Sequence, residues 1–441
     1  PLDVWSPGVQ VSVDEAKGQL HVTIPHDFHG VRTWFRFYDR NGASKLLPFL
    51  VGELPELEEI EPNDHVADAQ SLSEFAQPPN DARVTVNGRL QKHHDVDTFA
   101  FSMHQGQTMV LDVDAHQAFE SPMDAILQVV STSGTVLAES HDDVGLDPRV
   151  SFTAPEDGLY LARVFAFPAA PNQSIRFHGG DDYVYRLTLT TGPYITHASP
   201  LQVSSQSAGQ TAPHLQVLGW NLPAGTRFSA KRLDKEHYSR FPWVDASVPS
   251  LGDSRGCICV APWSGWAPVF IHDDRKSFPV GRDSDAPVTM TLPATVSGAM
   301  LRRSESHHYQ FHLEKGQHIR ISVDAVELNS RLVPHVRLYG PDAKLKKETP
   351  LRSGISDVRL DYTAGQEGIH RMTLQDRFGH ASQRHFYHLA VDATSSDFWL
   401  ELDQDRLQAR PGESESLSVK VHRILGGGPK VEDVEISWVG L

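Results

Sequence analysis

Six side chains with oxygen donors lie close together in the first third of the chain. They come from the stretches EIEPND and HHDVD, and they are Glu59, Glu61, Asn63, Asp64, Asp95 and Asp97. Like charges at this density repel one another unless a cation lies among them. Ca²⁺ takes about six to eight oxygen ligands, which carboxylates and an amide oxygen can supply. These residue types therefore suit the binding of a hard divalent cation.

An extended backbone would help the first stretch to hold such an ion. Alternate residues of a strand point to one side, so Glu59 and Glu61 would share a face. A turn at Pro62 would bring Asn63 and Asp64 to the same place. Two other interpretations stay open: a solvated acidic linker, and a site for another ion or a partner.

The formal net charge of −16 is confined to one segment. Residues 53–190 hold 23 acidic and 7 basic side chains, whereas the rest of the chain holds 33 of each. A single acidic segment indicates local cation binding, and it argues against a nucleic acid partner. No run of about 18 apolar residues predicts a transmembrane segment. Because no basic and apolar leader opens the chain, we expect a mature or excised piece of a longer, exported protein.

Short alternating runs of apolar and polar residues, separated by Gly, Pro, Asn and Asp, predict an all-β protein. The acidic segment alone contains several such runs, which are 109–115, 125–130, 149–154, 160–167 and 183–190. Helical patterns are almost absent. One short helical turn is expected at HVADAQSL (65–72), with Asp64 as its N-cap.

An internal repeat with an offset of 210 residues organises the chain. Gly88 matches Gly298, and the motifs GQ at 106 and VDA at 113 recur at 316 and 323. Further matches follow in the same order after small insertions. We therefore interpret 59–192 and 282–393 as two copies of one β module.

Shorter segments with strand patterns lie around the two copies, and they look like small immunoglobulin-like sandwiches. The prediction is a series of tandem β-sandwiches. A partial Ig-like domain at 1–54 precedes a first module at 55–192, an Ig-like domain at 193–281, a second module at 282–393 and a partial Ig-like domain at 394–441.

The first copy contains EPND, VNGRL, DVDTFAF, LDVDA, FTAPEDGLYLARV and YVYRLTL in this order. In these motifs it resembles the bacterial pre-peptidase C-terminal (PPC) domain, a family that includes the collagen-binding domains of clostridial collagenases. The alternation of modules is similar to large secreted or envelope proteins of planctomycete-like bacteria. The second copy fits the fold pattern but not the acidic motif.

The resemblance implies a jelly-roll-like sandwich that is exported and accessory to an enzyme or a surface protein. In the collagenase branch, calcium ties the linker to the sandwich, and the matching ligand positions here are Glu59, Glu61, Asn63, Asp64, Asp95 and Asp97. In the second copy Glu305 and His307 replace the two downstream aspartates, so we expect no calcium there.

Two further clusters have a plain structural interpretation. Asp142, Asp143 and Asp147 fall in an expected loop, where bonds to the backbone are favoured over a second ion. Cys257 and Cys259 are expected on one face of a strand. Buried thiols or a strained disulfide are favoured there over zinc, because no further ligand pair stands nearby.

Signatures of catalysis are missing. The chain has no G-x-S-x-G elbow, no Gly-rich phosphate loop and no papain-like cysteine motif. A triad assembled from distant residues would leave no such pattern. Because none of these motifs is present, we predict no enzymatic activity. Trp220, Trp263 and Trp266 fit either a ligand groove or a sandwich core, and we favour the core for Trp220.

These patterns predict a non-catalytic structural or adhesive protein that is extracellular, on the cell surface or periplasmic. A calcium-stabilised joint would connect the first Ig-like domain to the first module. Its partners would be further copies of itself, or extracellular protein or polysaccharide. The alternative is a substrate-binding accessory region of a secreted hydrolase.

Overall fold

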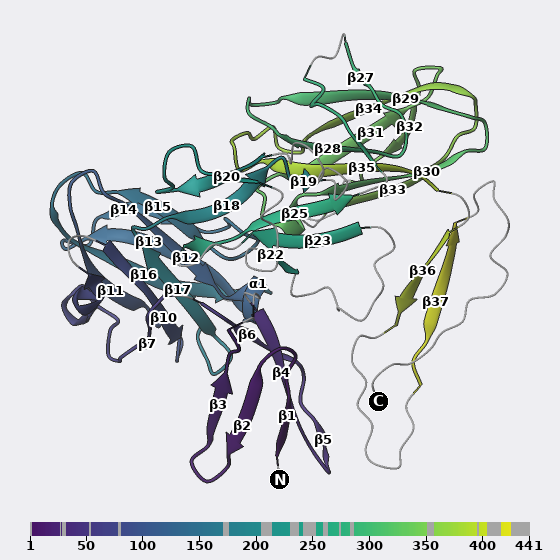
Figure 1. The fold of residues 1–441 in the computed structure, drawn as a ribbon. Helices are drawn as coiled ribbons and strands as arrows, with labels where there is room; N and C mark the ends of the chain where they lie inside the picture. Colours follow the sequence, from purple (N-terminus) through teal and green to yellow (C-terminus); the bar gives the residue numbers. More distant parts are fainter. Residues whose placement is uncertain are drawn as a thin grey trace. The chain divides into compact units, whose positions relative to one another are not determined.

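In the computed structural model the chain is built almost entirely from β-strands, which confirms the predicted fold class (Figure 1). Within the described residues α1 (His116–Phe119) is the one α-helix, and no helix there is long and apolar enough to cross a membrane. Short 3-10 turns occur at η1 (Val66–Asp68), η2 (Ser73–Phe75) and η5 (Val326–Leu328). The structure describes residues 2–26, 28, 32–52, 54–77, 81–170, 176–203, 214–229, 238–240, 253–258, 263–272, 275–282, 286–350, 357–394, 397–403 and 416–424.

The chain divides into two compact units. One holds Asp3–Arg36 and Leu46–His272, and the other holds Pro1–Leu2, Phe37–Lys45 and Asp273–Leu441. Each unit contains one large β-sandwich.

The start of the chain forms a small sheet and a hairpin. In the sheet, β4 pairs with β1, β5 and β6, and β2 and β3 form the hairpin. The strands are β1 (Asp3–Trp5), β2 (Gln10–Asp14), β3 (Gln19–Thr23), β4 (Arg32–Asp39), β5 (Gly42–Ala43) and β6 (Leu47–Leu50). The buried Arg32 donates a hydrogen bond to the carbonyl of Ala118 in α1, which ties β4 to the first sandwich.

Two sheets form the first sandwich, with strand orders β15-β12-β17-β10-β7 and β14-β13-β16-β11-β8. The first sheet contains β7 (Glu56–Glu58), β10 (Asp81–Arg89), β12 (Thr108–Asp114), β15 (Arg149–Thr153) and β17 (Val184–Thr190), with β9 (Ala76–Gln77) paired to β10. The second contains β8 (Gln70–Ser71), β11 (Asp97–Met103), β13 (Met123–Ser131), β14 (Val136–Ser140) and β16 (Gly158–Pro168). The strands predicted between 109 and 190 are therefore confirmed. Alternate apolar residues such as Val86, Phe99 and Leu127 fill the core between the sheets.

Two four-stranded sheets follow in the same unit. One contains β18 (Tyr194–Ser199), β20 (His214–Trp220), β21 (Arg227–Ser229) and β24 (Ser264–Gly265), and the other contains β19 (Gln202–Val203), β22 (Tyr238–Arg240), β23 (Asp253–Ile258) and β25 (Ala267–His272). The Trp220 ring packs edge-on against the buried Tyr194, with 5.8 Å between the centroids. Cys257 pairs in β23 with Ser239 and Pro268, whereas Cys259 lies outside the described residues.

The second sandwich has the same topology as the first. Its sheets have the orders β33-β30-β35-β28-β26 and β32-β31-β34-β29-β27. The strands are β26 (Lys276–Ser277), β27 (Val288–Thr289), β28 (Ala294–Ala299), β29 (Ser306–Leu313), β30 (His318–Asp324), β31 (Pro334–Tyr339), β32 (Leu345–Glu348), β33 (Val358–Thr363), β34 (Gly368–Asp376) and β35 (Phe386–Thr394). Each strand therefore has a counterpart in the first sandwich, as a duplicated module requires.

Near the end of the chain, β36 (Asp397–Leu402) and β37 (Val419–Ile424) form an antiparallel pair. Residues 425–441 of the partial Ig-like domain expected at 394–441 lie outside the described residues.

The glycine that recurs in the two copies has a packing role. Gly88 pairs across the sheet with Tyr185, and Gly298 pairs with Tyr387. In both cases an added Cβ would overlap the tyrosine ring or hydroxyl. The missing side chain thus lets the tyrosine lie across the neighbouring strand, with its hydroxyl at the end of the sandwich core.

Replacing Gly88 by Ala should destabilise the first module by about 1–3 kcal/mol, because the new methyl group has to displace Tyr185. Hydrogen exchange of peptides from β10 and β17 would measure the loss of protection. Gly158→Ala is the matched control, since its Cβ would meet only Tyr160 at an ordinary 3.9 Å. Equal losses in the two variants would contradict the packing role.

Candidate metal centre

A short segment crosses from one sheet of the first sandwich to the other. It begins after β7, which pairs in parallel with β10, and it ends at β8, which pairs in parallel with β11. The crossing segment, residues 59–69, carries the first four predicted ligands, and the remaining two stand just before and at the start of β11. The two edge pairings therefore bring both acidic stretches to one place.

Three carboxylates meet at this crossing. One oxygen each from Glu61, Asp95 and Asp97 lies within 4.8 Å of the other two. Asp95 and Asp97 are fully buried, and Glu61 is half-buried. Ionised carboxylates this close, and this far from water, destabilise a fold unless positive charge or protons compensate them.

Buried oxygens without hydrogen bonds mark the same point. Asn63 is fully buried, and its Oδ1 has no hydrogen-bond partner. Oδ1 of Asp95 and Oδ1 of Asp97 also lack one, although Lys92 Nζ forms an ion pair with the former at 3.6 Å. Buried polar atoms in proteins are nearly always satisfied. A hydrogen-bond donor or a cation could serve all three oxygens.

The protein holds the other oxygen of each aspartate. Oδ2 of Asp95 accepts a hydrogen bond from the Gln91 backbone N–H, and Oδ2 of Asp97 accepts one from the Tyr185 hydroxyl at 2.5 Å. The same hydroxyl lies 3.4 Å from Glu59. Each aspartate is thus oriented by one oxygen, which leaves the second for another partner.

Burial shifts the acid–base behaviour of this cluster. Burial and the adjacent Glu59 carboxyl raise the pKa of Asp97 to about 10. Burial also raises the pKa of Asp95, and the charge of Glu61 adds to that shift. A cation among these oxygens would favour their ionised forms instead.

Asp64 lies at the rim of the cluster, and its role as a helix N-cap was predicted wrongly. Residue His65 precedes η1, which has no side-chain cap. The Asp64 carboxylate instead accepts hydrogen bonds from the Val96 N–H at 3.3 Å and Lys92 Nζ at 3.2 Å. Burial opposes the shift, but these bonds lower the pKa of Asp64. The loop between β10 and β11 thus supplies the donors to Asp64 in place of a helical turn.

The second sandwich has the same crossing between its sheets, but different charged side chains lie there. Its segment runs from β26, paired in parallel with β28, to β27, paired in parallel with β29. There Arg282 Nη1 forms an ion pair with Glu305, whose other oxygen accepts hydrogen bonds from the Leu301 and Arg302 N–H groups at 2.6 and 2.9 Å. A guanidinium therefore supplies the positive charge at this end of the second module.

The interior partner of the crossing also differs between the copies. In the first module the Tyr185 hydroxyl is hydrogen-bonded to Asp97. The equivalent Tyr387 hydroxyl in the second module is hydrogen-bonded to His307 Nδ1 at 2.7 Å and to the Tyr309 hydroxyl at 2.8 Å. Burial lowers the pKa of His307 to about 4. Burial raises the pKa of Glu305. Hydrogen bonds from the Arg302 and Leu301 N–H groups and the charge of Arg282 outweigh that effect and lower the pKa to about 2.

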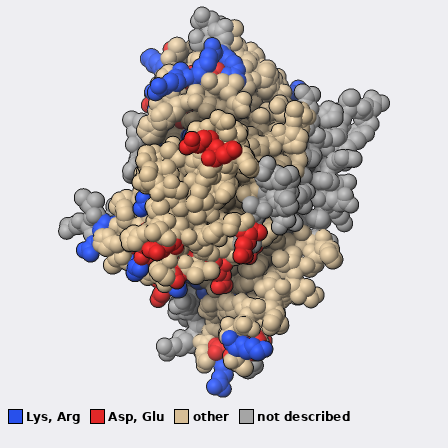
Figure 2. Space-filling view, turned by 90° about the vertical axis from the view of Figure 1, so that its left-hand side faces the viewer, with Lys and Arg blue, Asp and Glu red and all other residues tan. Residues whose placement is uncertain are grey.

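Many acidic side chains of the first module are inside it. On the face of the chain shown in Figure 2, Asp and Glu form small separate groups and not one continuous patch. Buried aspartates include Asp95, Asp97, Asp112, Asp143 and Asp147, each at most 8% exposed. The net charge of the segment therefore overstates how acidic its surface is.

Two of the three loop aspartates, Asp143 and Asp147, have partners of their own. Asp147 accepts hydrogen bonds from the Ala115, His116 and Gln117 N–H groups at 3.1, 2.7 and 3.0 Å, which caps α1. Asp143 forms an ion pair with Arg149 at 3.7 Å, and Asp142 is exposed.

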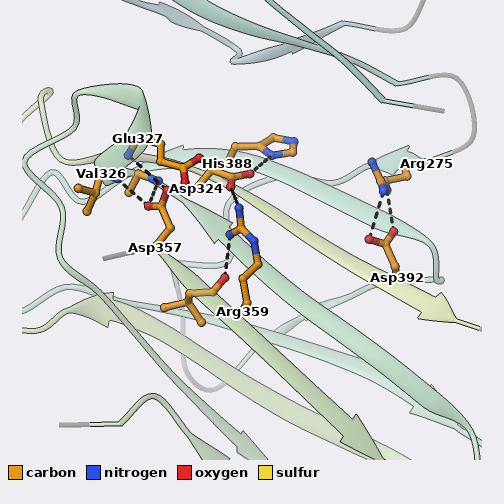
Figure 3. A network of polar contacts seen from close by, with 10 residues as sticks. Arg275, Asp324, Val326, Glu327, Asp357, Arg359, His388 and Asp392 are labelled. Carbon is orange, nitrogen blue, oxygen red and sulfur yellow. Dashed lines mark hydrogen bonds and ion pairs between the residues drawn. The ribbon is translucent and has the colours of Figure 1, made fainter. Parts of the chain in front are cut away.

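A related network occurs in the second module, where sequence reasoning found no acidic cluster. Asp357 accepts hydrogen bonds from the Ala325, Val326 and Glu327 N–H groups (Figure 3). Asp324 is bound by Arg359 and lies 3.4 Å from His388 Nδ1. Oxygens of Asp324, Glu327 and Asp357 lie within 4.8 Å of one another. The bonds to backbone and guanidinium give this cluster a structural role.

No family model and no curated protein matches this chain. Among solved structures, the pre-peptidase C-terminal domain of collagenase from Bacillus anthracis is 15% identical with a TM-score of 0.20, over 24% of this chain and 95% of that one. The M60 catalytic domain with two CBM51 domains of Clostridium perfringens ZmpB is 10% identical with a TM-score of 0.17. That match covers 88% of this chain and 43% of the other, so the chain spans less than half of that protein's length. Tandem CBM51 modules of a Streptococcus pneumoniae family 98 glycoside hydrolase are 10% identical with a TM-score of 0.17, over 70% and 83% of the two chains.

Replacing Arg282 by Met should destabilise the second module by about 2 kcal/mol, because Glu305 would keep its charge in a buried place. Hydrogen exchange in β28 and β29 would report the loss. The double variant Arg282→Met with Glu305→Gln should recover most of it, since no charge is then left unpaired. A double variant as unstable as the single one would contradict the ion-pair role.

Acid should destabilise the second module in two steps. His307 and Glu305 have folded pKa values of about 4 and about 2, below unfolded values of about 6.5 and 4.3. The folded module therefore binds fewer protons, so stability is lost as the pH falls from about 6.5 to 4, and again below about 4.3. Urea unfolding of this module can be monitored by hydrogen exchange of its peptides. The urea concentration at the unfolding midpoint should be lower at pH 4.5 than at pH 7. His307→Gln should lessen that first drop.

Proposed function

We propose that this chain is a non-catalytic, exported structural or adhesive protein in which a bound Ca²⁺ ion holds the crossing segment, the link that follows the preceding domain, to the first module. Glu59, Glu61, Asn63, Asp95 and Asp97 would hold the ion, with Asp64 at the rim. When bound, the ion would supply the positive charge that lets these carboxylates stay ionised in the protein interior.

One observation carries this proposal. Oδ1 of Asn63, Oδ1 of Asp95 and Oδ1 of Asp97 are buried without hydrogen bonds, beside the Glu61 carboxylate. Among these donors there is neither nitrogen nor sulfur. A set made of carboxylates and an amide oxygen suits calcium, which accepts many oxygen ligands in flexible geometry, better than zinc or copper.

The joint would gain stability because the donors come from two separate stretches. Glu61 and Asn63 belong to the crossing segment, while Asp95 and Asp97 belong to the sandwich. Binding energy at such a site is also docking energy for the segment. The Thr98 N–H donates to the Asn63 carbonyl at 3.2 Å, so the backbone already supports the docked position.

The second module supports the same interpretation as an internal comparison. At the equivalent crossing its carboxylate is Glu305, and Arg282 supplies the compensating charge.

A binding role at a surface, rather than catalysis, suits tandem sandwiches without a catalytic motif. Partners would be extracellular protein or polysaccharide, or further copies of the chain.

Removing calcium with a chelator should lower the melting temperature of residues 53–190 and leave residues 282–393 unchanged. At a free calcium concentration of about 100 times Kd the ion would stabilise the first module by about 2.7 kcal/mol. Differential scanning calorimetry with hydrogen exchange mass spectrometry would assign each transition to its module.

Asp95→Asn and Asn63→Ala should each abolish or strongly weaken this calcium response, as measured by isothermal titration calorimetry. Glu305→Gln in the second module is the matched control, and it should leave calcium binding unchanged. Identical melting of the first module with and without chelator, together with no calcium heat, would overturn the proposal.

A further inference from the structure

The outer face of one sheet in the second sandwich contains a pocket. It has a volume of about 280 Å³ and lies over β29, β31 and β34, beside the start of β27. Its walls include Pro287, His308, Tyr339, Ala343, Arg371 and Thr373. The neighbouring residues Met372 and Leu338 point into the core, so strand alternation sends the polar side chains outward.

The strand register brings these polar side chains onto adjacent rungs. Arg371 lies opposite Tyr339 on one side and Gln310 on the other. On the next rung Thr373 lies opposite His308 and Arg337. An aromatic ring, a guanidinium, an imidazole and a hydroxyl therefore converge on one spot of the sheet.

The first sandwich shows what this face looks like when it is closed. At the equivalent rung Leu161 lies opposite Val130 and Ala100. These side chains are buried, and Val66 and Ala69 of the crossing segment pack against them. The two copies thus differ in a matched way: the covered face is apolar, and the face with the pocket carries polar groups.

Charge around the pocket is unbalanced. The nearby acids each have a cation, since Asp342 pairs with Lys346 at 2.9 Å and Glu348 pairs with Arg337 at 2.7 Å. Arg371 has no ion pair within the described part of the chain. An exposed guanidinium fork at a pocket wall is suited to a carboxylate from outside.

We propose that this pocket binds an acidic sugar unit of a polysaccharide. The sugar carboxylate would pair with Arg371, one face of the sugar ring would lie on Tyr339, and Thr373 and His308 would bond its hydroxyls. The volume is just below the range of ligand pockets, which starts at about 300 Å³, and suits a single ring better than an extended peptide. This site is independent of calcium in the first module.

The test is calorimetry of the full chain with a tetramer of galacturonic acid, a neutral galactose tetramer and a hexaglutamate peptide. The acidic sugar should bind, and the neutral sugar should bind at least about tenfold more weakly. Arg371→Met should weaken binding of the acidic sugar at least about tenfold, and Tyr339→Ala should weaken it as well.

Arg303→Met is the matched control, because it removes the same charge from an exposed position of the same module outside the pocket. Circular dichroism would confirm that each variant is folded. No binding of the acidic sugar, an equal loss in Arg303→Met, or tighter binding of hexaglutamate would each overturn the proposal.

Discussion

The balance of charge where the chain crosses from one sheet to the other is the constraint on which both sandwiches depend. The crossing segment pairs first with an edge of one sheet and then with an edge of the other, so it closes one end of the core. Buried carboxylates stand at that end in both copies, as Asp97 in one and Glu305 in the other. A buried carboxylate needs a positive partner or a proton. In the second copy the partner is Arg282, and in the first we propose a metal ion.

Duplication of the module has kept the scaffold and changed the chemistry placed on it. The glycine and tyrosine at the end of the core recur as Gly88 with Tyr185 and as Gly298 with Tyr387. The aspartate that caps a short helical turn recurs as Asp147 and Asp357. Around these constant contacts the charge at the crossing and the polarity of the outer sheet face differ between the copies. Each copy can therefore be used as the control for the other.

Much of the fold could be predicted from the sequence, because strand alternation and the repeat offset are local or pairwise patterns. The strands from 109 to 190 can be predicted in this way, whereas the acidic pair Asp95 and Asp97 stands out by its side-chain types alone. Contacts that depend on register could not be found. Nothing in the spacing of Tyr185 shows that its hydroxyl reaches Asp97, and Arg282 stands in a stretch with no recognisable motif. The pocket near Arg371 arises only when three strands lie side by side.

The parallel pairing of the crossing segment has a further consequence for association between molecules. In the first sandwich β7 covers the free edge of β10 and β8 covers the free edge of β11. If the segment came away, two rows of unpaired backbone groups would be exposed at once, and such edges recruit strands from other chains. A crossing segment docked in this way therefore also protects both sheet edges, and its release would open them to strand exchange with another molecule.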